Sequence, residues 1–255
     1  MENVQISDYN DTNKVVQANE LIRKSTGNIN TVALKTFRLL ISCIDAKNPP
    51  KDYSVYVTKD DLLSFSGAQG KGELSYLKKQ LNSLITAINL TDEDGEYKTV
   101  ALLTSYSWKA NSNVVKCTFH EDVWPYLTDL QKMFTQYNIL QIKEFRSKFS
   151  IILYENLLSY TRQTGTKSIC MSMKTLRYIT GTEKKYKSMK DFEKNVLKVA
   201  QEEINNDPYI EFLFSYEKKR TGHEISDILF FLRKRTSMDD SLEYAEYPDR
   251  LKEAI

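Results

Sequence analysis

Side chains that suit DNA binding gather on one stretch of this sequence, residues 184–205. Wound as a helix at about 100° per residue, the stretch forms an apolar face from Phe192, Val196, Val199 and Ala200, with Leu197 and Ile204 at its edge. The far side carries Asp191, Lys194, Asn195, Lys198, Gln201, Glu202 and Asn205, and before it lie Lys184, Lys185, Lys187 and Lys190. Lysine suits phosphates and amides suit base edges. A solvated surface helix has the same pattern, so the other elements must decide.

Patterns for catalysis or metal binding are missing from the sequence. His120 and His223 share no motif, and the cysteines at 43, 117 and 170 have no pairing or ligand spacing. The glycine-rich residues 67–72 have two residues rather than four before Gly-Lys, and glycine follows, so they indicate a turn and not a phosphate loop. No nucleophile motif occurs. We expect no enzyme activity, no catalytic residue, no metal and no cofactor.

The composition is that of an ordinary globular protein with room for two domains. The 255 residues are 41% hydrophobic and 27% charged, and 36 Lys and Arg nearly balance 34 Asp and Glu. Net charge therefore says nothing about a nucleic-acid partner, although an acidic stretch from residue 237 onward leaves the rest more basic. No apolar run approaches the roughly 18 residues of a membrane span, and the polar start is no signal peptide. We expect a cytoplasmic protein that does not bind membranes.

The order of predicted elements repeats along the chain. The first set is a helix from residue 30, a strand at 53–57, a short helix at 58–66, a helix at 74–88, and a hairpin of 97–108 with 114–119. The second set is a helix from 147 or 148, a strand at 168–171, a short helix at 172–181, the helix at 191–205 within the stretch 184–205, and a hairpin of 209–216 with 224–235, turning at 217–223. Residues 57–67 align with 171–181 without a gap, at a separation of 172 − 58 = 114.

This repeat predicts an α+β fold of two tandem winged-helix domains related by internal duplication. Thr58 and Ser172 are the expected helix caps, and Gly67 and Gly181 the expected stops. In a winged helix the second helix of the helix–turn–helix enters the major groove, and the hairpin touches the backbone. A duplicated α+β domain without a nucleic-acid role is the alternative.

The two halves differ in charge on the predicted DNA side. Lys79 aligns with Lys194, Gln80 with Asn195, and Ser83 with Lys198. The second wing carries Lys218, Lys219 and Arg220, whereas the first wing tip at 110–113 has no charge. Because phosphate attraction supplies most non-specific affinity, we expect the second domain to dominate DNA binding.

The chain resembles the iteron-binding plasmid replication initiators. The resemblance covers roughly residues 14–235 and includes the helices at 146–157 and 172–181, together with Tyr186, Lys187, Asp191, Phe192, Lys194, Leu197, Glu203, Ile204 and Asn205. It implies a monomer that binds direct repeats at a plasmid origin, helps open the duplex and recruits host replication proteins. It also implies a dimer that binds an inverted repeat near its own promoter and represses it.

The resemblance also divides the chain. It implies a first domain at 14–142 with the dimer interface and secondary DNA contacts, and a second at 143–235 that reads the repeats. The flexible start at 1–13 and the acidic tail at 236–255 have no clear counterpart. A winged-helix transcription regulator and a non-DNA-binding assembly protein remain alternatives. The predicted DNA-binding residues are Lys187, Lys190, Lys194, Asn195, Lys198, Gln201, Lys218, Lys219, Arg220, Ser147, Lys148 and Lys79.

Overall fold

The structure is a computed structural model of the chain, and it describes residues 13–24, 29–45, 48–67, 73–85, 87–91, 97–128, 130, 133–164 and 167–236. The predicted N-terminal segment up to 12, the rest of the turn at 68–72 and the acidic tail from 237 lie outside these residues. The first half contains β1 (Lys14–Ala18), α1 (Asn19–Ile22), α2 (Thr31–Ser42), β2 (Ser54–Thr58), α3 (Lys59–Ser66), α4 (Glu73–Leu84), β3 (Ala87–Thr91), β4 (Tyr97–Ala101), β5 (Leu103–Ser107), β6 (Val114–Phe119), α5 (Pro125–Thr128), β7 (Phe134–Asn138) and the 3-10 helix η1 (Ile139–Ile142).

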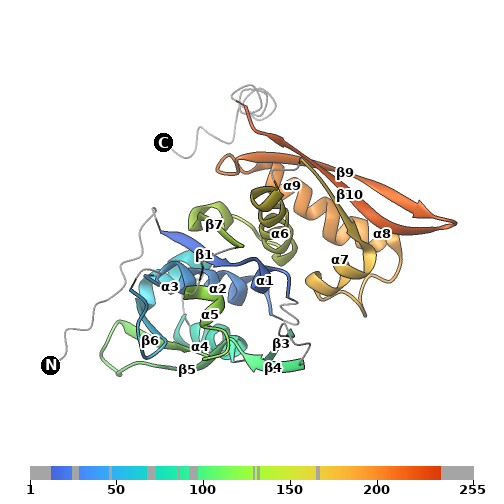
Figure 1. Cartoon of the computed structure of the whole chain (residues 1–255). Helices are drawn as coiled ribbons and strands as arrows, with labels where there is room; N and C mark the ends of the chain where they lie inside the picture. The colour runs from blue at the N-terminus through green and yellow to red at the C-terminus, as the bar shows by residue number, and fades with distance from the viewer. Residues whose placement is uncertain are drawn as a thin grey trace.

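The second half repeats the core of the first. It contains α6 (Lys148–Thr164), β8 (Ser168–Ser172), α7 (Met173–Thr180), α8 (Met189–Phe192), the π-helical η2 (Glu193–Leu197), α9 (Lys198–Asn206), β9 (Phe212–Thr221) and β10 (Glu224–Lys234). Its antiparallel sheet has the order β8-β10-β9, which matches β2-β6-β5 in the first half. In Figure 1 the helices of the second half lie on one side of the β9–β10 hairpin, and the hairpin tip extends past them. This is the predicted arrangement of two winged helices.

The repeated short helices begin and end as the sequence predicts. The side chains of Thr58 and Ser172 each accept the backbone N–H three residues later, at 3.0 Å, and so cap α3 and α7. Gly67 and Gly181 end these helices in the left-handed region, with φ of 74° and 63°. Both short helices therefore begin and end at the predicted residues.

The region between α4 and β5 differs from the prediction. Helix α4 ends at Leu84 instead of 88, and β3 follows and pairs with β4. Ile88, predicted on the buried helix face, is buried on β3, while Leu74 and Ile85 are 44% and 41% exposed. The β-branched residues Ile88 and Thr91 favour the strand. The predicted strand at 97–108 is two strands, broken at the buried Leu102.

The second wing is longer than predicted. Strands β9 and β10 continue to a two-residue turn at Gly222 and His223, so residues 217–221 belong to β9 and not to a loop. Gly222 has a φ of 62°, which glycine adopts without strain and which a tight hairpin requires at its first central position. Lys218, Lys219 and Arg220 therefore alternate across a strand instead of sharing a flexible tip.

A buried polar network joins the two halves. Glu155 on α6 accepts hydrogen bonds from Arg38 on α2, at 2.6 and 2.8 Å, from Tyr137 on β7 at 2.6 Å and from Gln17 on β1 at 2.8 Å. Arg38 is 2% exposed and Glu155 1%. Strands β1 and β7 pair with each other, and α6 packs against α1, β7 and α9. The arrangement of the domains is thus fixed by a core that both supply.

Candidate nucleic-acid interface

The predicted DNA-reading helix begins at Met189, two residues before the start at 191 that the sequence pattern indicates. Ser188 caps it, because its hydroxyl accepts the N–H of Asp191 at 3.1 Å and donates to the Asp191 carboxylate at 2.6 Å. The lysine-rich segment 184–187 precedes the helix. Arg177 on α7 holds this segment, because its guanidinium donates to the carbonyls of Lys185, Tyr186 and Lys187 at 3.1 Å. The side chain of Lys187 is exposed at the helix start.

A π-helical turn changes which side chains face the core. In η2 the wider turn adds one residue, so Val196 and Leu197 are both fully buried. Leu197 was predicted at the edge of the apolar face, whereas Val199, predicted on that face, is half-buried. Lys190, Lys194 and Lys198 remain exposed.

The amides predicted to reach bases are already hydrogen-bonded. The Asn195 side chain donates to the carbonyl of Asp191 at 2.8 Å, within its own helix. The Gln201 side chain donates to the carbonyl of Phe214 on β9 at 3.0 Å. Base contacts by Asn195 and Gln201 stay predictions; each amide has a second N–H and a carbonyl oxygen besides the donor that binds the backbone.

The three wing cations have different surroundings. Lys218 lies on the face of β9 that looks toward the helix, and its ammonium pairs with Glu193 at 2.9 Å. The hydrogen bond from Lys218 is the largest cause of the lowered pKa of Glu193. Arg220 donates to the carbonyl of His223 at 3.1 Å. Lys219 is exposed on the opposite face of the strand, where it can meet phosphate directly.

A groove separates the reading helix from the wing. It has a volume of about 640 Å³ and is lined by Glu193 and Gln201 from the helix and by Tyr216, Lys218 and Arg220 from β9, among others. The Tyr216 hydroxyl donates to Glu193 at 3.2 Å. Burial of the phenol is the main cause of its raised pKa, so it stays a hydrogen-bond donor. Glu193, Tyr216 and Lys218 thus form one hydrogen-bonded wall of the groove.

The corresponding surface of the first half is built from aromatic rings and cations. Tyr106 and Trp108 stack with their ring centres 5.6 Å apart, and Lys59 and Lys78 lie 5.4 and 5.8 Å from the centre of the Trp108 ring. Lys79, the predicted secondary contact, is exposed on α4. The first domain thus also presents lysines beside its wing.

The amino end of α6 is occupied by a carboxylate. Glu203 on α9 accepts the N–H of Ser147 at 3.1 Å and the N–H of Arg146 at 3.2 Å. Lys148 is half-buried there, and burial lowers its pKa. A phosphate at the predicted Ser147–Lys148 contact would have to displace Glu203.

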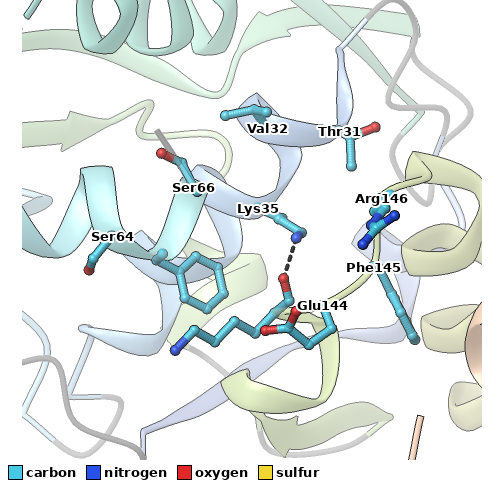
Figure 2. A pocket seen from close by; sticks show the side chains of 11 residues that line it. Thr31, Val32, Lys35, Ser64, Ser66, Glu144, Phe145 and Arg146 are labelled. Atoms are coloured by element: carbon cyan, nitrogen blue, oxygen red, sulfur yellow. Dashed lines mark hydrogen bonds between the residues drawn. The ribbon is translucent and has the colours of Figure 1, made fainter. Parts of the chain in front are cut away.

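The segment between the domains is tied to the first domain by a buried lysine. Lys35 on α2 is 8% exposed and donates to the carbonyl of Lys143. Figure 2 shows its side chain pointing to the linker, in a cavity of about 370 Å³ bounded by α2, the end of α3 and residues 143–146. Burial lowers the pKa of Lys35. Since Glu203 binds the same linker, the reading helix and the first domain share a support.

Comparison with known proteins now identifies the family. The model of the first winged-helix domain of initiator replication proteins matches residues 14–158, and the model of their second winged-helix domain matches residues 172–231. The chain belongs to this initiator family. The first match ends within α6, whereas we predicted the domain boundary between 142 and 143.

The chain is also similar to two individual proteins, one by sequence and one by structure. A replication initiation protein of Escherichia coli is 25% identical over 177 residues, which are 66% of this chain and 55% of that protein, so the match spans about half the relative's length. The structure of the Pi initiator protein in complex with iteron DNA matches with a TM-score of 0.70 at 19% identity, over 89% of this chain and 100% of that one. The second match confirms the tandem winged-helix fold.

Glu193 and Tyr216, which line the groove, were not among the DNA-binding residues predicted from the sequence of this initiator. A signal for Glu193 was present, because the alignment that pairs Lys79 with Lys194 also pairs Lys78 with Glu193, a reversal of charge between the halves. Within the described ranges, no cluster of three or more His, Cys, Asp or Glu could hold a metal ion. None of the described helices has the length and apolar content needed to cross a membrane.

Proposed function

We propose that this initiator binds double-stranded DNA sequence-specifically and starts plasmid replication at direct repeats of its origin. The observation that carries the proposal is the exposed cationic face of the second reading helix, with Lys190, Lys194 and Lys198 beside a basic wing. Family membership and the fold of a relative seen with iteron DNA support it. The chain works without a cofactor and without catalytic chemistry of its own.

The second domain supplies the main contacts in this proposal. Lys194 and Lys198 face the major groove, Lys187 and Lys190 meet phosphates near the helix start, and Lys219 holds the backbone through the wing. The first domain adds weaker contacts and the surface of a homodimer that exchanges with monomer. The monomer recruits host replication proteins, and the dimer represses the promoter by binding an inverted repeat.

A pair of alanine variants tests the assignment of contacts. Lys198→Ala should weaken binding to a duplex that the wild-type protein selects from a randomised pool, by about 1–3 kcal/mol, and should relax the specificity of binding. Lys219→Ala should weaken all sequences alike and lower the salt slope by about 1. Lys51→Ala removes an exposed cation outside the predicted contacts and is the matched control. If both site variants bind like the control, the reading helix and wing are wrongly assigned.

Replication itself needs a separate test. The gene with its flanking DNA is placed on a plasmid that has no other origin, and transformants are counted. Stable maintenance that is lost in Lys198→Ala supports the initiator role. DNA binding without maintenance favours a transcription regulator, and the absence of any mobility shift favours an assembly protein.

A further inference from the structure

The two winged helices place residues of opposite charge at the same position of the reading helix, Lys78 in the first half and Glu193 in the second. Tyr106 pairs with Cys117, which pairs with Val55, and Tyr216 pairs with Phe230, which pairs with Ile169. Val55 and Ile169 are separated by 114 residues, which is the separation of the internal repeat. The two tyrosines therefore occupy equivalent places on their wings.

Two residues further along each wing, Trp108 is therefore equivalent to Lys218. Across the groove, Lys78 is equivalent to Glu193. The first half thus pairs a helix lysine with a wing tryptophan, and the second pairs a helix carboxylate with a wing lysine.

Glu193 and Glu217 are the acids in a groove that is also lined by Lys218 and Arg220, and Glu193 is the one that pairs with Lys218. Its two oxygens accept from Lys218 at 2.9 and 3.1 Å, and one also accepts from Tyr216 at 3.2 Å. Lys198 lies close enough to favour its charged form. The side chains of Glu193 and Lys218 are 21% and 40% exposed, so DNA in the groove would meet both. The carboxylate neutralises Lys218 and repels a phosphate at the same place.

We propose that Glu193 is a specificity residue that selects against DNA of the wrong sequence. On arbitrary DNA, a phosphate that takes Lys218 leaves the carboxylate facing the backbone without its cation. On the recognised sequence, an amino group on a base edge replaces Lys218 as the partner of Glu193, as carboxylates accept from cytosine N4. The repulsion weakens the complex with arbitrary DNA more than the complex with the recognised sequence, so it increases the discrimination between the two DNA sequences. The inference rests on the proposed reading face.

The test compares Glu193→Gln with Glu202→Gln, which removes an exposed charge from the same helix. The probes are a duplex selected by the wild-type protein from a randomised pool and a scrambled duplex of the same length and composition. Glu193→Gln should bind the scrambled duplex more tightly, with a salt slope steeper by about 0.9, because Lys218 then meets one more phosphate. The ratio of specific to non-specific affinity should fall by about fivefold or more. Glu193→Asp should restore much of it.

Two results would overturn the proposal while leaving the reading face intact. Either Glu193→Gln matches Glu202→Gln, while Lys198→Ala still relaxes specificity, or Glu193→Gln weakens both duplexes equally with no change in salt slope, as a purely structural clamp would. If Lys198→Ala is also silent, the proposed function's own contact assignment has failed. Thermal melting of each variant separates loss of folding from loss of discrimination.

Discussion

Replacing Glu155 by glutamine should remove a large part of the stability of this chain. The carboxylate joins the two domains, and Arg38 lies against it with 2% of its surface exposed. Glutamine keeps the volume and some hydrogen bonding but not the charge. The guanidinium, whose pKa the carboxylate helps to raise, cannot lose its proton and becomes an uncompensated buried cation.

The geometry sets the magnitude. Removing one partner of a buried ion pair costs about 3–5 kcal/mol, whereas an exposed pair contributes about 0.2–1 kcal/mol. The chain holds an exposed pair of similar length, Lys116 with Asp52 at 2.9 Å, with side chains 38% and 53% exposed. We expect Glu155→Gln to lower the free energy of unfolding by about 3–5 kcal/mol and Lys116→Met to lower it by less than about 1 kcal/mol.

Urea unfolding followed by circular dichroism measures both variants under the same conditions. The double variant Arg38→Met with Glu155→Met removes both charges, and it should recover part of the loss because neither ion is left alone. Equal, small losses for Glu155→Gln and Lys116→Met would refute the reasoning. The reasoning would also fail if the double variant lost as much stability as Arg38→Met and Glu155→Met lose together when each is made alone.

Other predictions concern the groove and the helix ends. The pKa of Glu193 lies below its usual value, chiefly through the Lys218 hydrogen bond, so NMR titration of the carboxyl group should show this pKa rise in Lys218→Met. Because the folded pKa is lower than the unfolded pKa of about 4.3, the contact stabilises the fold fully above the unfolded pKa. This stabilisation is lost as pH falls through the folded pKa. Gly67→Ala should cost about 1 kcal/mol in thermal melts, purely from its φ of 74°, because the added methyl group meets nothing within 4 Å. Ser188→Ala should cost about 1 kcal/mol by loss of the cap on α8.

Local signals made the repeated core predictable. The caps at Thr58 and Ser172 and the stops at Gly67 and Gly181 are short-range features, and the structure places each where the sequence indicated. The length of the second wing was not predictable in the same way. Residues 217–221 are all exposed and carry no apolar alternation, so only pairing with β10 reveals a strand.

Contacts distant in sequence account for the rest. Arg38 and Glu155 are 117 positions apart, and no periodicity links them. At the site, the exposed lysines of the reading helix follow from its amphipathic pattern, but the π-helical turn that buries Leu197 does not. The pairing of Lys218 with Glu193 depends on the strand register of the wing, which the loop assignment at 217–223 concealed.

The different helix–wing pairs of the two halves give a single bound chain a direction. A palindrome mirrors two-fold symmetry in the protein, and one chain with a Trp108–Lys78 side and a Glu193–Lys218 side has no such axis. A monomer can therefore lie on its site in one orientation only, and neighbouring copies on one strand must follow head to tail. An inverted repeat becomes readable only when a second chain supplies the missing symmetry. Under the proposed function, the number of chains that bind together would decide between the direct repeats of the origin and the inverted repeat.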